Sequence, residues 1–283
     1  MIALYIIAGV LILLSVAWLF AIGAVRDKRM DKFKDEYFAH RGFHGKLAAY
    51  KDAAPENSLK AFERAVEQGF GIELDVRLSK DGEIVVFHDD TLTRVAGSDK
   101  KVRELTLSEL RELSLLGTDE KIPLFSEVLS LVNGRVPLLV EIKEDGFDHS
   151  VTEKALELLR EYKGDYIVES FSPLCLGVVK KNAPQTLRGF LCDKLTDEER
   201  YRSIKYRVVQ RHLLNFISRP HFIAASYKQS RMLPIPLIRV LFRPAFVAWT
   251  IRSEEQEAEA RRRGFTSVIF EGYIPKRVSK NGK

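Results

Sequence analysis

The sequence of 283 residues predicts an α/β protein, a (β/α)8 barrel of the TIM type preceded by one N-terminal transmembrane helix. Three observations lead to this prediction. The N-terminus carries an uncharged apolar run, and strand-length apolar runs then alternate with amphipathic helical stretches. The remaining length of about 240 residues is close to the ~250 typical of such barrels. A hydrophobic content of 46% is enough to form a core, which excludes a disordered or low-complexity chain.

The apolar run from Ile2 to Val25 contains no charged residue and is long enough to cross a bilayer, which takes about 20 residues. Lys and Arg are frequent directly after the run and absent before it, so the positive-inside rule predicts that the part of the chain after the run faces the cytoplasm. The alternative is a cleaved signal peptide, although the run lacks a basic start and is long for one. We therefore expect a single-pass membrane anchor over residues 1–25, a charged juxtamembrane linker over 26–36 and the barrel over 37–283.

Eight apolar runs are expected to form the barrel strands, and these cover residues 37–40, 72–78, 138–142, 166–170, 187–191, 222–225, 246–250 and 267–270. Amphipathic stretches between them predict helices over residues 59–68, 107–113, 126–132, 151–162 and 254–263. Residues 84–88 are expected to add a strand in the loop after the second barrel strand. Ser126 and Ser253 stand where helix caps are expected.

Several function classes are excluded or disfavoured by composition. Cys175 and Cys192 are too few for a disulfide framework, and no CxxC pair is present to hold zinc. The net charge of +6 is modest and spread along the chain, which is weak evidence for an anionic surface or substrate and none for nucleic acid. No GxGxxG motif or P-loop follows an early strand, which excludes the usual nucleotide-binding folds.

Two carboxylates lie on one face of the predicted strand 72–78. Glu73 and Asp75 are separated by one apolar residue, so both side chains point the same way. Carboxylates on a buried strand are costly unless compensated, and a divalent cation such as Mg²⁺, Ca²⁺ or Mn²⁺ compensates oxygen ligands naturally. Glu141 and Lys143 repeat the spacing, so Glu141 would complete the metal site and Lys143 would meet an anionic substrate. An ordinary surface-facing alternation explains one such pair alone, but two pairs in apolar strands favour a site.

His40 and His88 each close a predicted strand, at the end of a barrel that carries catalytic residues. Histidine can accept or donate a proton near neutral pH. The planar guanidinium of Arg41, next to His40, suits a phosphate. These residues together favour metal-assisted chemistry on a phosphodiester. Four other histidines lack such a setting and are expected to be structural or solvated: His44, His149, His212 and His221.

Several short motifs follow one another in a fixed order from about residue 37 to the end of the chain. They are His40-Arg41-Gly42, Pro55-Glu56-Asn57-Ser58, Glu73-Leu74-Asp75, Asp81-Gly82, His88-Asp89 with Leu92 and Arg94, Ile122-Pro123 with Glu127-Val128-Leu129, and Glu141-Ile142-Lys143. Two weaker motifs come later, Ser170-Phe171-Ser172 and Trp249-Thr250. This ordered set resembles the glycerophosphodiester phosphodiesterase family, and the apolar N-terminus suggests a membrane-anchored bacterial-type member.

The resemblance implies a TIM barrel that hydrolyses glycerophosphodiesters to an alcohol and glycerol 3-phosphate with one divalent cation, Mg²⁺ or Ca²⁺. It implies that Glu73, Asp75 and Glu141 are the metal ligands. It also implies that His40 and His88 form the general base and acid pair, without saying which is which. The expected substrate contacts are Arg41 and Lys143 on the phosphate, with Phe171 and Trp249 lining the pocket.

The sequence departs from the family pattern at three places. Ser58 stands where the family usually has Thr, which keeps a hydroxyl and a helix cap. Val95 replaces a hydroxyl residue that often follows the motif's Arg. Phe270-Glu271-Gly272 stands where the family's last strand typically ends in Thr-Asp. This last departure leaves the substrate-side geometry of that edge open without touching an expected metal ligand.

Two alternatives remain open from the sequence. An anchor keeps the site near the bilayer, which suits a lysolipid substrate and lysophospholipase D-type hydrolysis. A catalytically silent, lipid-binding barrel is disfavoured because both histidines and all three carboxylates are present. Residues 231–243 are expected to pack on the barrel rather than rest on a membrane, and Pro234 and Pro236 disfavour a continuous helix there. The expected ligand is thus a small-molecule or lysolipid phosphodiester, with no nucleic acid and no specified protein partner.

Overall fold

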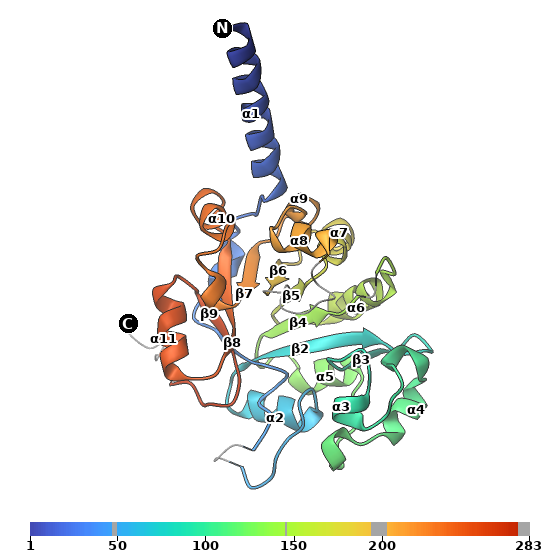
Figure 1. The fold of residues 1–283 in the computed structure, drawn as a ribbon. Helices are drawn as coiled ribbons and strands as arrows, with labels where there is room; N and C mark the ends of the chain where they lie inside the picture. The colour runs from blue at the N-terminus through green and yellow to red at the C-terminus, as the bar shows by residue number, and fades with distance from the viewer. Residues whose placement is uncertain (47–49, 145, 194–202, 277–283) are drawn as a thin grey trace.

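A computed structural model describes residues 1–46, 50–144, 146–193 and 203–276 (Figure 1). Eight parallel strands close into a barrel because β1 pairs with both β2 and β9, and β3 pairs antiparallel with β2. The predicted TIM barrel is therefore confirmed. The strands are β1 Tyr37–Ala39, β2 Gly71–Leu78, β3 Ile84–Val86, β4 Leu138–Ile142, β5 Tyr166–Ser170, β6 Arg188–Cys192, β7 Phe222–Ala225, β8 Ala245–Ile251 and β9 Ser267–Phe270.

Helices surround the barrel on its outside (Figure 1). They are α1 Ile2–Ala21, α2 Leu59–Glu67, α3 Thr93–Ala96, α4 Leu107–Glu112, α5 Phe125–Val132, α6 Ser150–Glu161, α7 Pro173–Asn182, α8 Ile204–Gln210, α9 Asn215–Ser218, α10 Ile235–Leu241 and α11 Glu254–Arg262. Short 3-10 helices cover η1 Lys28–Phe33, η2 Val102–Glu104, η3 Leu115–Gly117 and η5 Tyr227–Gln229. The last seven residues of the predicted barrel domain, 277–283, lie outside the described residues.

The predicted strands and long helices agree with the structure to within one or two residues. One expected cap is wrong: α5 begins at Phe125, and the Glu127 carboxylate accepts from the Leu124 amide (2.8 Å), so Ser126 lies inside the helix. Ser253 does cap α11 and accepts from the Gln256 amide. Ser58 similarly caps α2. Side-chain bonds to free amides at these positions fix where the helices begin.

The segment 231–243 contains only a short helix, α10, which includes Pro236 in its first turn. Proline is tolerated there because those amides have no partner inside the helix. Ile235 and Ile238 are buried and hold α10 against the barrel, whereas Val240 and Leu241 remain exposed. The packing predicted for this segment is thus confirmed, with part of its apolar surface left uncovered.

The main core lies between the outer face of the barrel and the helices. Outward side chains such as Leu74, Val140 and Val168 share one apolar cluster with Phe62 of α2 and Phe125 of α5. The sheet therefore buries both of its faces, which explains why the strands read as continuous apolar runs.

The segment between α1 and β1 closes the amino end of the barrel. Met30 and Phe33 of η1 are buried in a cluster with residues inside the barrel, among them Phe38, Leu139, Ile167, Phe222 and Ile269. The amide of Val25 donates to the carbonyl of Pro220 (2.9 Å), two residues before β7. The stretch predicted as a linker is therefore packed against the barrel.

The helix α1 is long and apolar enough to cross a membrane, with a mean hydropathy of 2.6 and none of its 18-residue apolar window buried. Its length and composition suit both an anchor and a signal sequence. The helix projects away from the barrel at one end, and its last turns pack against α9 and, through Leu19, against the main core cluster (Figure 1). There the rings of Phe20 and Phe216 lie 5.9 Å apart, and the guanidinium of Arg219 lies 4.5 Å from the Phe20 ring.

Candidate active site

Three carboxylates meet inside the barrel on two neighbouring strands, at the level of the next-to-last residue of β4. Glu73 and Asp75 lie on β2 and Glu141 on β4, and the parallel register pairs Asp75 directly with Glu141. All three are buried, with exposed fractions of 0–5%. Each offers a carboxylate oxygen, and these oxygens all lie within 4.8 Å of one another. The predicted clustering of these residues follows from the strand pairing.

Two cations lie against this cluster. Lys143 Nζ lies 3.0 Å from Asp75 Oδ1 and 2.7 Å from Glu141 Oε1. Arg41 donates its backbone amide to Glu73 Oε2 (2.8 Å) and places Nε 3.7 Å from Asp75 Oδ2. Lys143 and Arg41 thus compensate part of the negative charge.

Lys143 and Arg41 do not balance all of the negative charge in this part of the barrel. Glu169, at the end of β5, is buried beside Glu141 in register, and its Oε2 has no hydrogen-bond partner among the described residues. Four buried carboxylates therefore face two cations. Burial and the negative charges of its neighbours raise the pKa of Glu73 well above its usual range. Burial would also raise the pKa of Asp75, but Lys143 and nearby positive groups hold it well below.

This donor set fits one divalent cation. Oxygen ligands of this kind suit Mg²⁺ or Ca²⁺, and a charge of +2 would balance the excess of carboxylates. Binding would also lower the proton affinity of Glu73, since the ion and the proton compete for the same oxygen.

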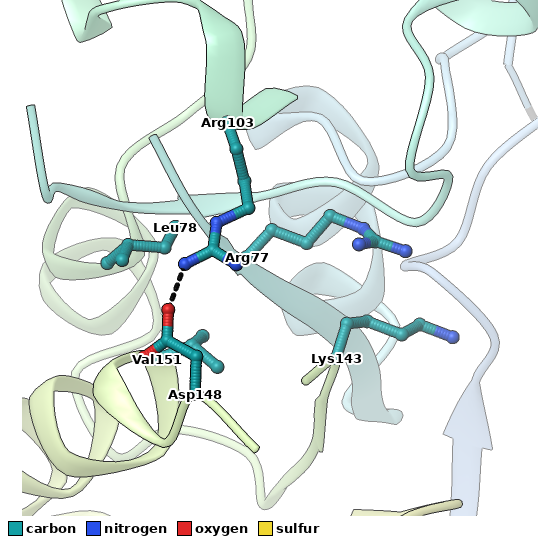
Figure 2. A pocket seen from close by; sticks show the side chains of 6 residues that line it. All are labelled: Arg77, Leu78, Arg103, Lys143, Asp148 and Val151. Carbon is teal, nitrogen blue, oxygen red and sulfur yellow. Dashed lines mark hydrogen bonds and ion pairs between the residues drawn. The ribbon is translucent and has the colours of Figure 1, made fainter. Parts of the chain in front are cut away.

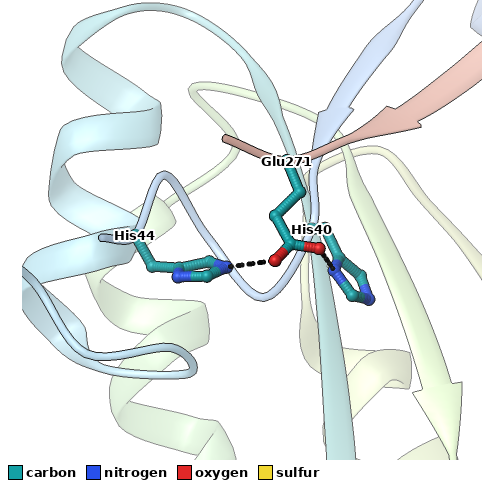
Figure 3. Close-up of side chains that lie close together, drawn as sticks. All are labelled: His40, His44 and Glu271. Carbon is teal, nitrogen blue, oxygen red and sulfur yellow. Dashed lines mark hydrogen bonds and ion pairs between the residues drawn. The ribbon is translucent and has the colours of Figure 1, made fainter. Parts of the chain in front are cut away.

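His40 lies directly after β1, next to the carboxylates, and is held from the neighbouring strand β9. Its Nδ1 is 3.0 Å from Oε2 of Glu271, which follows β9 (Figure 3). The bond to His40 lowers the pKa of Glu271 to about 2, so its carboxylate can only accept, and Nδ1 must carry the proton. Burial lowers the pKa of His40, which keeps the ring neutral. The Nε2 lone pair of His40 is therefore left for another partner.

His88 follows β3 and is arranged in the same way. Its Nδ1 lies 2.6 Å from Oδ1 of Asp89, and Arg94 Nε donates to the other oxygen of Asp89 (2.7 Å). Despite burial, the bonds from Arg94 and His88 lower the pKa of Asp89 to about 2. Burial lowers the pKa of His88 to about 4. Both histidines thus present Nε2, with Nδ1 held by a carboxylate.

Polar side chains from the loop between β1 and α2 hold the arginines and Asp75 in place. Glu56 accepts from Arg41 Nη1 (2.7 Å) and from both terminal nitrogens of Arg94 (2.7 Å each). Asn57 Nδ2 donates to Asp75 Oδ2 (2.9 Å). The Pro55-Glu56-Asn57-Ser58 motif therefore connects the carboxylates, through Arg41 and Asn57, with His88, through Arg94 and Asp89.

The remaining predicted residues, Phe171 and Trp249, contact each other, and Phe171 lies near Lys143. Phe171 and Trp249 make an edge-on contact at 5.8 Å between ring centroids, and Lys143 Nζ lies 5.9 Å from the Phe171 ring. Both aromatic residues are half-buried, and Trp249 Nε1 has no hydrogen-bond partner in the described part of the chain. A half-buried aromatic pair with an unpaired donor is suited to contact a substrate.

Figure 2 shows a small hollow that Lys143 shares with Arg77. Its rim is closed by an ion pair between Arg103 and Asp148, and Leu78 and Val151 complete the lining. Lys143 connects this hollow with the carboxylates, since its Nζ lies 2.7 Å from Glu141 Oε1, whereas Arg77 donates to the carbonyl of His88 (2.9 Å). Two cationic side chains in one hollow favour an anion.

Sequence reasoning missed three residues of this region. Glu169 repeats the alternation of Glu141 in the next strand along the chain, and that repetition was a usable signal. Glu271 and His44 carry no such signal, because their approach to His40 depends on the pairing of β1 with β9. His44, expected to be structural or solvated, lies 3.9 Å from Glu271 (Nε2 to Oε1).

Comparison with known proteins agrees with this geometry. The model of the "Glycerophosphoryl diester phosphodiesterase family" matches residues 40–271. A glycerophosphodiester phosphodiesterase from Caldanaerobacter subterraneus subsp. tengcongensis is 38% identical over 148 residues, which are 48% of this chain and 61% of that relative. The lysophospholipase D GDPD1 of Rattus norvegicus is 29% identical over 156 residues, 50% of this chain and 46% of that relative. The matched segments thus cover less than two thirds of either relative.

Two solved structures share the fold. The crystal structure of a glycerophosphodiester phosphodiesterase from Thermotoga maritima has a TM-score of 0.61 and 32% identity, covering 83% of this chain and 93% of its own. An Oleispira antarctica phosphodiesterase, solved with the product sn-glycerol-3-phosphate, has a TM-score of 0.69 and 23% identity, covering 85% and 94%. The family model covers most of the barrel and includes every residue brought together above. The chain therefore belongs to the glycerophosphoryl diester phosphodiesterase family, a family of phosphoric diester hydrolases.

Proposed function

We propose that this protein hydrolyses glycerophosphodiesters to an alcohol and glycerol 3-phosphate with the help of one divalent cation. The observation that carries the proposal is the meeting of three buried carboxylates with two histidines that are each held at Nδ1 by a carboxylate. Such an arrangement suits proton transfer at a charged phosphodiester. Membership of the family and the glycerol 3-phosphate bound by the Oleispira antarctica structure support the same reaction.

In this proposal Glu73, Asp75 and Glu141 hold the cation, which would offset charge on the phosphoryl oxygens and acidify a hydroxyl of the substrate. Arg41 lies with its guanidinium against Asp75 and Glu56, so it is placed to meet the phosphate as well. Lys143, at 2.7 Å from Glu141, supplies a second positive charge. The aromatic pair Phe171 and Trp249 would border the alcohol portion.

The two histidines share the proton transfers. The neutral ring takes at Nε2 the proton of a hydroxyl of the glycerol moiety as that oxygen attacks phosphorus, while the other ring, which carries a proton on both nitrogens at this stage, gives its Nε2 proton to the departing alcohol. Water then opens the cyclic phosphodiester with the two roles reversed, which again leaves one neutral and one charged ring. Glu271 and Asp89 hold Nδ1–H of His40 and His88, so Nε2 is the atom that gains or gives the proton. The geometry treats the two histidines alike, so the roles are assigned to the pair.

Lysophospholipase D-type hydrolysis is the second candidate, because one relative carries that name and α1 is apolar enough to cross a membrane. The path of the chain favours the smaller, soluble substrate. Residues 22–36 enter at the amino end of the barrel, whereas the carboxylates lie further along its strands, toward their carboxyl ends. An anchored protein would thus have its site directed away from the point of attachment.

The test uses the full-length chain in detergent with glycerophosphocholine, glycerophosphoethanolamine, glycerophosphoglycerol and lysophosphatidylcholine. Released glycerol 3-phosphate and lysophosphatidic acid are measured with Mg²⁺, with Ca²⁺ and with EDTA, and in parallel for His40→Ala. We expect cation-dependent release of glycerol 3-phosphate that the variant lacks. Release of lysophosphatidic acid alone would select the second candidate, and equal turnover by His40→Ala would contradict the site.

A further inference from the structure

A second group of metal-ligating side chains lies beside the carboxylate cluster. It consists of His40 after β1, His44 from the following loop and Glu271 after β9, and these three are called the histidine cluster below (Figure 3). Glu271 lies between the two imidazoles, with its two oxygens directed at different rings. All three side chains are partly buried, with side-chain exposures of 15%, 19% and 26%.

The donor set is different from that of the carboxylate cluster. Two imidazole nitrogens and one carboxylate suit Zn²⁺, whereas Mg²⁺ and Ca²⁺ prefer oxygen ligands. Tetrahedral zinc with bonds of about 2.0–2.1 Å requires donor atoms about 3.4 Å apart. His40 Nδ1 lies 3.0 Å from Glu271 Oε2, and His44 Nε2 lies 3.9 Å from the other oxygen, Oε1. One donor atom from each residue lies within 4.8 Å of the other two, so small side-chain rotations suffice to reach this spacing.

The His44 side chain is available to coordinate a metal ion. Its Nε2 is buried and has no hydrogen-bond partner within the described residues, so coordination would cost it no existing bond. Burial lowers the pKa of both His40 and His44, and neutral imidazole is the form that binds metal. The competing cation is Arg252, which donates to Glu271 Oε2 at 2.9 Å but has a side chain that is 58% exposed. An exposed arginine can turn into solvent when an ion arrives.

We propose that His40, His44 and Glu271 form a Zn²⁺ site distinct from the carboxylate cluster, and that its occupation inhibits hydrolysis. Coordination at Nδ1 of His40 moves the proton of the neutral ring to Nε2. The lone pair that the proposed reaction needs is then lost. The inhibitory part rests on the proposed function, while the binding part stands without it.

Binding is measured by titrating the full-length chain, in detergent and saturating Mg²⁺, with ZnCl₂ in a calorimeter. We expect one Zn²⁺ per chain, and at least ~10-fold weaker binding in His44→Ala and in the bulkier His44→Gln. The matched control is His149→Ala, since His149 also lies 3.1 Å from a carboxylate, that of Glu144, but belongs to neither metal-ligating group. Binding by both His44 variants as tight as that of the unaltered chain would overturn the proposal.

Inhibition is measured on the same samples with glycerophosphodiester as substrate. Without zinc, His44→Ala should turn over as the unaltered chain does, and it should need at least ~10-fold more Zn²⁺ for half inhibition. Raising Mg²⁺ tenfold should leave the inhibition unchanged. Relief by Mg²⁺ would place the zinc on the carboxylates and overturn the inhibitory role. A chain that binds Zn²⁺ as expected but hydrolyses none of the substrates would contradict the proposed function alone.

Discussion

Glu73→Gln tests the carboxylate cluster most directly, because it removes a charge and keeps the shape. The glutamine oxygen can still accept the amide of Arg41, which donates to Glu73 Oε2 at 2.8 Å. Burial raises the pKa of Glu73 well above its usual range, because the negative charge is costly there when no cation is bound. Glutamine removes that charge and keeps the size of the side chain. The variant should therefore fold as the unaltered chain does in EDTA, with melting temperatures that agree.

Glu73→Gln and the unaltered chain should differ in stability and turnover once the cation is added. At a concentration 100 times its dissociation constant, a ligand stabilises the native state by about 2.7 kcal/mol. For a chain of this size that corresponds to a rise of about 5–11 °C in Tm. Glu73→Gln should lose most of this rise, and its turnover should fall by ~10²–10³-fold, since a bound cation contributes several kcal/mol to the transition state.

The assay is thermal unfolding with Mg²⁺, Ca²⁺ or EDTA, followed by turnover of glycerophosphocholine. Glu169→Gln is the matched control, since Glu169 is equally buried on the next strand but lies outside the group of three ligands. It should keep the cation-dependent rise in Tm. A Glu73→Gln chain that is stabilised by the cation as strongly as the unaltered chain would refute the assignment of Glu73 as a ligand.

Three further predictions concern the surroundings of the site. Asp89→Asn should lower kcat by about 10²-fold at unchanged Tm, because the amide no longer fixes the tautomer of His88, and a kcat within twofold of normal would contradict this. Burial lowers the pKa of His212 to about 4, so between pH 6.5 and 4 the unfolded chain binds a proton that the folded chain does not. The free energy of unfolding should therefore fall by about 3 kcal/mol as the pH drops through this window. In His212→Phe this contribution is absent, so the free energy of unfolding measured in urea should depend less on pH. Removing residues 1–21 should release the protein from membranes and leave turnover intact. Removing residues 1–36 should also lower Tm, because it uncovers the amino end of the barrel. Equal Tm values for the two truncated chains would argue against that packing.

The barrel was predictable because its strands are buried on both faces. The strands are mostly apolar runs of three to eight residues, and the strand pairing brings these runs together in chain order. The helix α7 was not predicted, since Gly177 and two adjacent valines interrupt its amphipathic pattern. It forms because Ser172 caps the amide of Cys175 (3.1 Å) and Pro173 occupies its first turn. Capping interactions thus explain why the helix α7 forms although its hydrophobic periodicity does not predict it.

The carboxylate cluster was predictable for a different reason. Alternation on a strand fixes the face of Glu73 and Asp75, and parallel pairing of consecutive barrel strands brings Glu141 beside them. Contacts that depend on closure of the barrel could not be predicted in this way. Glu271 reaches His40 only because the last strand pairs with the first, across more than 200 residues of sequence. The departure from Thr-Asp at the end of the last strand therefore turns out to lie against a predicted catalytic histidine.

The connection between α1 and the barrel bears on which substrate the site can reach. Segment 22–36 is fixed at the amino end, where the amide of Asp35 donates to the carbonyl of Thr266 (2.8 Å) just before β9. The carboxylates lie further along the strands: Asp75 is the fifth residue of β2 and Glu141 the fourth of β4, which corresponds to roughly 10–13 Å from the amino ends of these strands. If α1 spans a membrane, the site opens away from the point where the chain leaves the bilayer. A lysolipid in that bilayer would have to leave it before reacting, whereas a water-soluble glycerophosphodiester reaches the site by diffusion. The proposed preference for a water-soluble glycerophosphodiester over a lysolipid rests on this arrangement of α1 and the site.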